Sequence, residues 1–371
     1  MQYTLHLTND CNLSCKYCGL KKNRDYMSKE TAFSAIDLAL SEPDPSVGIG
    51  FYGGEPLLCK ELISEVTAYV KRKNTNKKVF YKLITNGLQL DQEFLTFANS
   101  EHILISLSLD GNELMHNTNR TDRNGNGSYR RLLNVIPLLL AQNRYAAAMV
   151  TISPNTVKYY SDGIKSIFTL GFRTIICSLD YSANWDDMTL QELSKQYKKL
   201  AELYYKKTVS EDKFFFSPFD SKIDSHIRNK EYCKERCKLG FEQISISTSG
   251  DLYPCVQFVG DCKYRIGHVH NGIDEARRME IYNASQTKQD ECERCAIHHR
   301  CMSSCACINK YSTGDINQPS PILCANEQLL IKSADNLAAK LYKHRNGMFL
   351  HKHYNENYSL VSLIEDSNIK I

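Results

Sequence analysis

Short apolar runs alternate with helical patterns along the first 215 residues. The first run is the clearest, because Tyr3, Leu5 and Leu7 alternate with polar residues as in a half-buried strand. Further strands are predicted at residues 47–52, 79–84, 102–109, 145–152 and 172–180. Strands that alternate with helices predict a parallel sheet, here an α/β fold wrapped into a partial (β/α)6 barrel. Parallel barrels place their active sites beyond the carboxyl ends of the strands.

Capping signals predict where two of the helices begin. Ser28 can cap a helix in which Phe33, Ile36 and Leu40 share one face. Thr189 and Glu192 have the spacing of a capping box, which predicts a helix starting at Thr189.

Three cysteines follow the first predicted strand directly. Cys11, Cys15 and Cys18 have the spacing CxxxCxxC, with Tyr17 just before the last cysteine. Three thiolates on one short loop can hold three irons of a [4Fe–4S] cluster and leave the fourth iron open to a ligand that is not protein. Structural zinc is the alternative, but zinc sites usually consist of CxxC pairs with four closed ligands. The spacing therefore favours an iron–sulfur cluster.

This loop resembles that of the radical S-adenosylmethionine (SAM) enzymes, in which SAM chelates the open iron through its amino and carboxylate groups. One electron from the cluster then breaks the sulfonium bond and yields a 5′-deoxyadenosyl radical. The ends of the next three predicted strands, in the runs YGGEP, TNG and SLDG, fit the same resemblance. It implies SAM contacts by Tyr17, Gly53, Gly54, Glu55, Asn86, Ser108 and Arg120.

The resemblance also gives roles to these residues. Tyr17 lies near the adenine, the segment around Glu55 holds the SAM amino group, and Ser108 and Arg120 contact the ribose and the carboxylate. For Arg120 a solvated loop position is the alternative, and Asp110 is interpreted as a turn former at a strand end.

Eight further cysteines form an ordered series between residues 233 and 324. The series reads Cx12Gx4C, then CxxCx5CxxxC, then a lone cysteine, and it resembles the SPASM domain, which carries two auxiliary [4Fe–4S] clusters. Zinc knuckles are the alternative interpretation of a CxxC pair. The resemblance assigns the first cluster to Cys233, Cys237, Cys255 and Cys305. It assigns the second cluster to Cys292, Cys295, Cys301 and Cys324.

These assignments divide the chain into four parts. Residues 1–215 are predicted to form the barrel, 216–232 a bridging helix, 233–326 the SPASM domain, and 327–371 a C-terminal helix and tail. Within the SPASM segment, Ile244 and Ile246 face Leu252 across a Ser-Gly-Asp turn, which predicts a hairpin.

The remaining cysteines and several histidines are interpreted without a metal. Cys59 and Cys177 are interpreted as buried residues of a helix and a strand. Cys262 and Cys307 are interpreted as small side chains that pack in the interior. The histidines near Cys301 and in the tail are interpreted as solvated: His298, His299, His344, His351 and His353.

Composition and charge limit the partners. The net charge of +4 is too small to argue for nucleic acid or a membrane, and no run approaches the ~18 apolar residues of a membrane span. Met1 leads directly into the first strand with no signal peptide, so a cytoplasmic location is expected. Fifteen cysteines in that compartment indicate metal binding and not disulfides.

The resemblance extends to anaerobic sulfatase-maturating enzymes and to ribosomal-peptide maturases. In the former an aspartate follows the cysteine that matches Cys255, whereas this chain has Val256. The hypothesis is therefore an oxidoreductase that forms thioether or carbon–carbon crosslinks in a ribosomally synthesised precursor peptide. Its partners would be that peptide, an electron donor such as flavodoxin or ferredoxin, and a separate leader-binding protein. The alternatives are a dehydrogenase acting on a protein side chain or small molecule, like the sulfatase maturases, and a non-catalytic, zinc-bound interaction protein.

Overall fold

The computed structural model describes residues 1–73, 76–228, 238–287 and 289–368. Cys233 and Cys237 lie outside the described residues, as do residues 229–232 of the predicted bridging helix.

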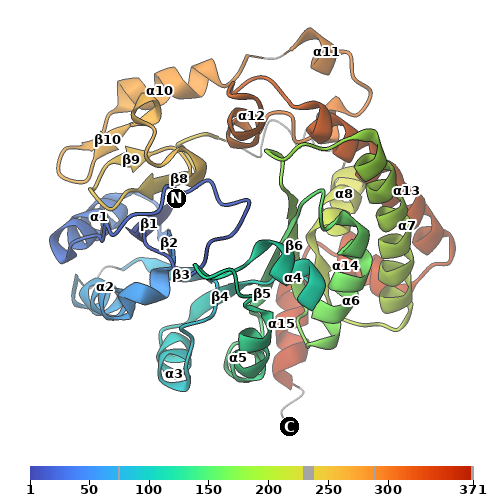
Figure 1. Cartoon of the computed structure of the whole chain (residues 1–371), viewed down its shortest axis with the longest axis horizontal. Helices are drawn as coiled ribbons and strands as arrows, with labels where there is room; N and C mark the ends of the chain where they lie inside the picture. Colours follow the sequence, from blue (N-terminus) through green and yellow to red (C-terminus); the bar gives the residue numbers. More distant parts are fainter. Residues whose placement is uncertain (74–75, 229–237, 288, 369–371) are drawn as a thin grey trace.

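All six predicted strands are present. They are β1 (Gln2–Thr8), β2 (Ser46–Gly53), β3 (Lys78–Thr85), β4 (Ile103–Ser108), β5 (Ala147–Ile152) and β6 (Thr174–Leu179). They pair in parallel and in chain order, and the short strand β7 (Phe215–Phe216) follows β6. The predicted parallel α/β fold, a sheet curved into a partial barrel, is confirmed (Figure 1).

Helices cover the outer face of this sheet (Figure 1). In chain order the helices of this part are α1 (Lys29–Ser41), α2 (Lys60–Lys73), α3 (Gln92–Ser100), α4 (Glu113–Asn119), α5 (Tyr129–Gln142), α6 (Tyr160–Thr169), α7 (Asp187–Val209) and α8 (Ser217–Arg228), of which the short helix α4 follows the end of β4. Within the described ranges, no helix has both the length and the apolar character needed to cross a membrane.

The two faces of the sheet differ in chemistry. Residues paired in register on parallel strands point to the same side, and successive residues alternate between sides. One register row consists of Leu5, Phe51, Leu83 and Ile105, all fully buried in the hydrophobic core on the helix side. The neighbouring row, on the inner side, contains Thr4, Gly50, Lys82 and Leu104. The helices therefore cover an apolar face and leave a more polar face on the inside of the barrel.

One of the two capping predictions is confirmed. The Ser28 hydroxyl accepts a hydrogen bond from the Thr31 amide at 3.1 Å at the start of α1. The capping box of α7 was placed wrongly, because the N-cap is Asp186 and Thr189 is its N3 partner. The Asp186 carboxylate accepts the Thr189 amide at 2.8 Å, and Thr189 Oγ1 accepts the Asp186 amide at 2.9 Å. An aspartate caps as well as threonine, so the helix begins one turn earlier than predicted.

The predicted SPASM segment continues the same sheet. The predicted hairpin is present as β8 (Gln243–Ile246) and β9 (Leu252–Tyr253), and β8 pairs in parallel with β1. Beyond it come β10 (Gly267–His268), β11 (Gly272–Ile273), α10 (Glu275–Ala284), α11 (Asp290–Glu293) and α12 (Ala306–Thr313). This segment spans the side of the molecule between β8 and α13 (Pro321–Lys343), which packs on α7 and α8 (Figure 1).

The C-terminal tail is helical, with α14 (Gly347–Tyr354) and α15 (Tyr358–Asn368). The expectation that its histidines are solvated is wrong for His353, which is buried. His353 Nε2 lies 3.0 Å from the Tyr204 hydroxyl, and Lys352 Nζ lies 2.7 Å from Asp220. Burial lowers the pKa of His353 to about 4. These contacts hold α14 against α7 and α8.

Candidate active site

The three N-terminal cysteines lie on one loop directly after β1. The Cys11 sulfur accepts the Leu13 amide at 3.4 Å, and the Cys18 amide donates to the Cys15 carbonyl at 3.2 Å. Burial raises the pKa of the Cys11 thiol to about 11. Without a metal this thiol is protonated, and a bound metal would hold it as the thiolate. Three free thiols on one short loop, with a backbone N–H directed at a sulfur, fit an iron–sulfur cluster. In the described ranges, no three His, Cys, Asp or Glu side chains are arranged around a single metal ion.

The glycines after β2 let two strand ends approach closely. Gly53 has φ +131°, and a Cβ there would lie 2.3 Å from the Thr8 carbonyl oxygen. A Cβ on Gly54 would lie 2.0 Å from the Asp10 carbonyl oxygen. Both positions therefore require glycine. The Gly54 amide donates to Thr8 at 2.7 Å and the Glu55 amide to Asp10 at 2.8 Å, so the YGGEP turn is fixed to the start of the cysteine loop.

Glu55 joins this turn to the end of β3. Its carboxylate is 1% exposed and accepts the Thr85 hydroxyl at 2.6 Å, the Asn86 amide at 2.8 Å and the Leu57 amide at 3.0 Å. Burial raises the pKa of Glu55 despite these hydrogen bonds. The Asn86 side chain in turn donates to Asn12 at 2.7 Å and points at the Cys11 sulfur, 3.8 Å away. Three strand ends are thereby connected around the cysteine loop.

Asp110 organises the end of β4. Its carboxylate is fully buried and binds Arg120 through two hydrogen bonds, Nε to Oδ2 at 2.9 Å and Nη2 to Oδ1 at 3.1 Å. The Tyr17 hydroxyl donates to Oδ2 at 2.5 Å, and the Thr151 amide donates to Oδ1 at 2.9 Å. The Arg120 guanidinium also lies 5.3 Å from the centre of the Tyr17 ring. The interpretation of Asp110 as a turn former was incomplete, and the solvated alternative for Arg120 is wrong because Arg120 is only 7% exposed.

Two further residues support this arrangement and were missed in the sequence. His116 Nδ1 accepts a hydrogen bond from the Asp110 backbone amide at 3.2 Å, and His116 Nε2 lies 2.9 Å from the Ser128 hydroxyl. Arg123 pairs with Asp10 and donates to the Cys11 carbonyl at 2.9 Å. The available signal in the sequence was an aspartate, Asp110, at the end of a predicted strand with the basic residues His116 and Arg123 after it. The sequence does not reveal which side chains these residues contact. Ser108 ends β4 half-buried on the inner face of the sheet.

Cys255 and Cys305, the two described members of the predicted first auxiliary group, both contact Cys307. The sulfurs of Cys305 and Cys307 lie 3.4 Å apart, and a hydrogen bond with Cys307 lowers the pKa of Cys255. The Gln243 amide donates to the Cys255 sulfur at 3.1 Å. Cys307 was expected to be mere packing, yet it lies against two predicted cluster ligands, as its spacing from Cys305 could have indicated. Cys262 was also expected to be buried, and it is exposed.

The predicted second auxiliary group lies between α11 and α13. The Cys295 amide donates to the Cys292 carbonyl at 3.1 Å. Burial raises the pKa of Cys324, and the charges of Cys292 and Cys295 raise it further, so these three thiols lie within electrostatic reach of one another. Cys301 is buried.

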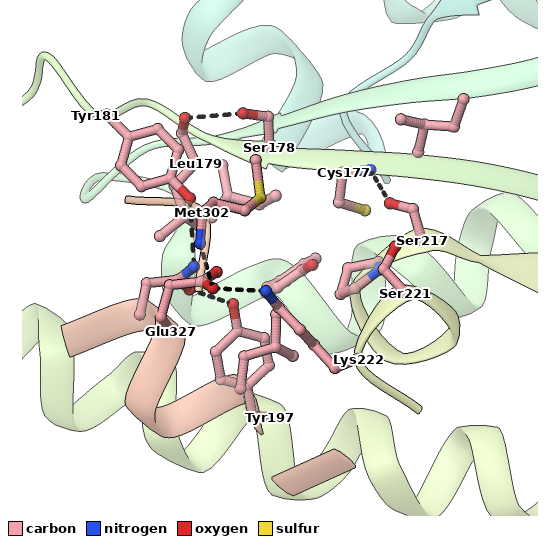
Figure 2. A pocket seen from close by; sticks show the side chains of 16 residues that line it. Cys177, Ser178, Leu179, Tyr181, Tyr197, Ser217, Ser221, Lys222, Met302 and Glu327 are labelled. Atoms are coloured by element: carbon pink, nitrogen blue, oxygen red, sulfur yellow. Dashed lines mark hydrogen bonds and ion pairs between the residues drawn. The ribbon is translucent and has the colours of Figure 1, made fainter. Parts of the chain in front are cut away.

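A cavity of about 220 Å³ lies beside this second group, between β6, α7, α8 and α13 (Figure 2). In it Lys222 Nζ and a Glu327 carboxylate oxygen form an ion pair at 2.5 Å, with both side chains no more than 2% exposed. The Met302 amide donates to the same carboxylate at 3.0 Å, and Lys222 also donates to the Arg300 carbonyl at 3.2 Å. The pair thus fixes the Cys301 loop to α13, the helix that carries Cys324.

Helix α12 links the two cysteine regions. It follows Cys305, and its Tyr311 hydroxyl donates to the Tyr17 carbonyl at 3.2 Å. The Tyr311 ring packs closely on Gly19, since a Cβ atom added to Gly19 would lie only 2.8 Å from the Tyr311 side chain. Gly19 directly follows Cys18, so α12 rests against the end of the CxxxCxxC loop.

Comparison with known proteins agrees with this geometry. Residues 5–158 match the sequence model of the Radical SAM superfamily. A cysteine-type anaerobic sulfatase-maturating enzyme of Clostridium novyi is 27% identical over 329 residues, which cover 80% of this chain and 85% of that protein. The sporulation killing factor maturation protein SkfB of Bacillus subtilis is 22% identical, over 85% of this chain and 71% of that protein.

Solved structures share the fold. The anaerobic sulfatase-maturating enzyme anSMEcpe with bound AdoMet (SAM) matches with a TM-score of 0.79 at 21% identity, over 92% of this chain and 100% of that chain. Streptococcus suis SuiB bound to its precursor peptide SuiA matches with a TM-score of 0.61 at 13% identity, over 87% of this chain and 75% of that chain. Residues 5–158 are therefore assigned to the Radical SAM superfamily, which implies a [4Fe–4S] cluster and SAM as cofactors.

Proposed function

We propose that this enzyme cleaves SAM reductively and uses the product to oxidise a peptide, forming a thioether or carbon–carbon crosslink in a ribosomally synthesised precursor. Cys11, Cys15 and Cys18 would hold the cluster. The cluster would supply the single electron needed for reductive cleavage of SAM, and SAM would supply the radical chemistry that removes a hydrogen atom from the substrate.

The observation that carries the proposal is the assembly of four strand ends around the cysteine loop. Asn86 contacts Cys11, and the YGGEP turn is fixed to Asp10. Arg120 uses Nε and Nη2 to bind Asp110, which fixes the guanidinium beside Tyr17. In this arrangement Tyr17, Arg120 and Ser108 would contact the adenine, the carboxylate and the ribose of SAM. These polar groups are held by contacts within the protein, so SAM binding there would require little reorganisation.

Two auxiliary clusters would accept the second electron of the oxidation. Two observations support this assignment: Cys255 and Cys305 both contact Cys307, and Cys292 and Cys295 lie within electrostatic reach of Cys324. Cys307 adds a fifth thiol to the first group, so Cys307 is a further candidate ligand there.

A peptide substrate is supported by the relatives. SkfB is named as a maturation protein for a killing factor, and SuiB is described in complex with a precursor peptide. The relatives also include sulfatase-maturating enzymes, but η3 (Val256–Phe258) places an apolar residue directly after Cys255. Val256 has no proton-accepting group, which favours the peptide maturases over the sulfatase maturases.

The test uses anaerobically reconstituted enzyme, dithionite, SAM and a panel of synthetic peptides that contain cysteine. The expected products are 5′-deoxyadenosine and a peptide that has lost two hydrogen atoms and is linked internally, as tandem mass spectrometry of its fragments reports. Oxidation of a single side chain with no link would contradict the crosslink. Formation of 5′-deoxyadenosine with every peptide unchanged would contradict the peptide substrate.

A further inference from the structure

The cavity of Figure 2 lies along one edge of β6. Strand β7 pairs with β6 only at Thr174 and Ile175 and then gives way to α8. The next four residues of β6, 176–179, all line the cavity (Figure 2). Successive residues of a strand point to opposite faces, so a cavity lined by four in a row follows the edge of the strand and not one face. Within the described ranges, no strand pairs with this side of residues 176–179.

The backbone of this edge has the groups that a further strand would bind. The Asp180 amide points to β5, where it donates to the Ile152 carbonyl at 2.8 Å, whereas the Cys177 amide points away from β5 and donates to the Ser217 hydroxyl at 3.0 Å. Groups two residues apart along a strand point the same way, so the Cys177 carbonyl and the Leu179 amide also face α8. A serine hydroxyl thus takes the place of the carbonyl that a neighbouring strand would offer.

This edge can be reached from solvent. Ser178 is exposed, and the neighbouring lining residues Cys177, Tyr181 and Met302 are half-buried. The cavity volume of about 220 Å³ is smaller than the roughly 300–1,000 Å³ of cavities that hold a small-molecule ligand. The cavity therefore suits one side chain of a longer molecule better than a whole cofactor.

The lining of the cavity favours an uncharged occupant. Its two charged side chains, Lys222 and Glu327, form an ion pair with each other and leave no net charge. The other polar lining groups are neutral and include the hydroxyls of Tyr181 and Ser221. A charged ligand would have to compete with the buried ion pair, whereas a neutral group leaves that pair intact.

The cavity lies between the two cysteine regions. Burial raises the pKa of Cys177, and the charge of Asp110 raises it further, so this wall of the cavity is within electrostatic reach of the carboxylate that binds Arg120. Burial also raises the pKa of Tyr181, and nearby charges raise it further, among them those of Cys305 and Cys301. A molecule bound along this edge would therefore lie near the end of β4 and near both predicted auxiliary groups.

We propose that an extended segment of the substrate peptide adds to β6 along residues 176–179 and places one uncharged side chain in the cavity. This inference rests on the proposed peptide substrate. A sheet edge binds an extended peptide through main-chain hydrogen bonds, and cavities for alternate side chains give specificity. The peptide would bind the backbone groups of Cys177 and Leu179 and displace the Ser217 hydroxyl. Residues on either side of the docked segment would then extend toward the proposed radical site and the auxiliary region.

One arm of the experiment changes the peptide and leaves the protein intact. A synthetic peptide that the wild type converts is methylated on one backbone nitrogen at a time. N-methylation within the docked segment removes a main-chain donor and should raise the KM about tenfold, whereas N-methylation outside it should leave the KM unchanged. The same KM for every N-methylated peptide would overturn the inference.

The other arm fills the cavity. Ser221→Phe should raise the KM for the unmodified peptide about tenfold and change kcat less, because it blocks docking and not chemistry. Ser221→Leu is the smaller replacement in case the larger ring prevents folding, and the Tm identifies the folded variants. The control Ser64→Phe, on the exposed face of α2, should match the wild type.

The outcomes separate the docking site from the proposed function. A wild-type KM in folded Ser221 variants would overturn the docking site alone and indicate a cavity filled by water. If the wild type converts no peptide at all, the proposed function fails and this inference fails with it.

Discussion

The two cysteine regions of this enzyme are supported in different ways. The N-terminal loop is connected to four strand ends by hydrogen bonds between protein groups, through Glu55, Asn86 and Asp110. The described part of the C-terminal region includes the short elements β9, β10, β11 and α11, and its polar supports include Gln243 and the pairs Lys222–Glu327 and Arg300–Asp335. We therefore expect the protein to pre-form its proposed radical site, and the proposed auxiliary region to depend on metal for much of its order.

The largest expected effect is that of removing the metal. Hydrogen exchange of chelator-treated protein should remain slow in β2 to β5, whose amides pair within the sheet. Exchange should become fast across residues 289–320, where cluster ligands would otherwise connect short elements. Equal protection of both regions in the metal-free protein would remove the distinction.

Asp110→Asn should damage the N-terminal site most among single substitutions. It leaves the buried Arg120 cation without its carboxylate, which costs about 3–5 kcal/mol of unfolding free energy. SAM cleavage should fall by about 10–100-fold, as for residues that orient ligands. Urea unfolding and 5′-deoxyadenosine yield measure the two effects.

The matched control for Asp110→Asn is Glu113→Gln. Glu113 pairs with Arg130 on the surface, and exposed pairs contribute under about 1 kcal/mol. A small effect of Asp110→Asn, similar to that of the control, would contradict the central role of this carboxylate.

Glu327→Gln should be the corresponding test of the C-terminal region. It leaves Lys222 as an unpaired buried cation, so we expect a loss of about 3 kcal/mol. The double variant Lys222→Met with Glu327→Leu should be much less destabilised, since no charge remains buried. SAM cleavage without peptide should be less affected than in Asp110→Asn, because the pair lies beside Cys301 and not beside Cys11.

A smaller effect is expected from acid. Burial lowers the pKa of His116 to about 3 and that of His353 to about 4, below the ordinary value of about 6.5 that applies to the unfolded chain. Between about pH 4 and 6.5 the unfolded state therefore binds more protons, and the unfolding free energy falls as the pH falls through this range. His353→Gln should flatten part of this dependence in urea titrations at several pH values. An unchanged slope would contradict the buried, neutral state of His353.

The sequence was sufficient for the strands and showed the close spacing of the three cysteines after the first strand. Period-two alternation and short spacing are local properties, so all six parallel strands could be predicted. The role of Asp110 was not local, because its partners Tyr17 and Thr151 come from other strand ends. Cys307 and His353 were missed for the same reason, since their environment depends on Cys255 and on Tyr204, which are distant in sequence. What the sequence could not provide was the identity of long-range partners.

The most direct test measures 5′-deoxyadenosine and iron in two sets of cysteine variants. Replacing Cys11, Cys15 and Cys18 by alanine should abolish 5′-deoxyadenosine while retaining the iron of the auxiliary clusters. Replacing Cys292, Cys295 and Cys301 should lower the iron content but leave SAM cleavage measurable. Undiminished 5′-deoxyadenosine from the first set would contradict the assignment of the radical site to the loop after β1.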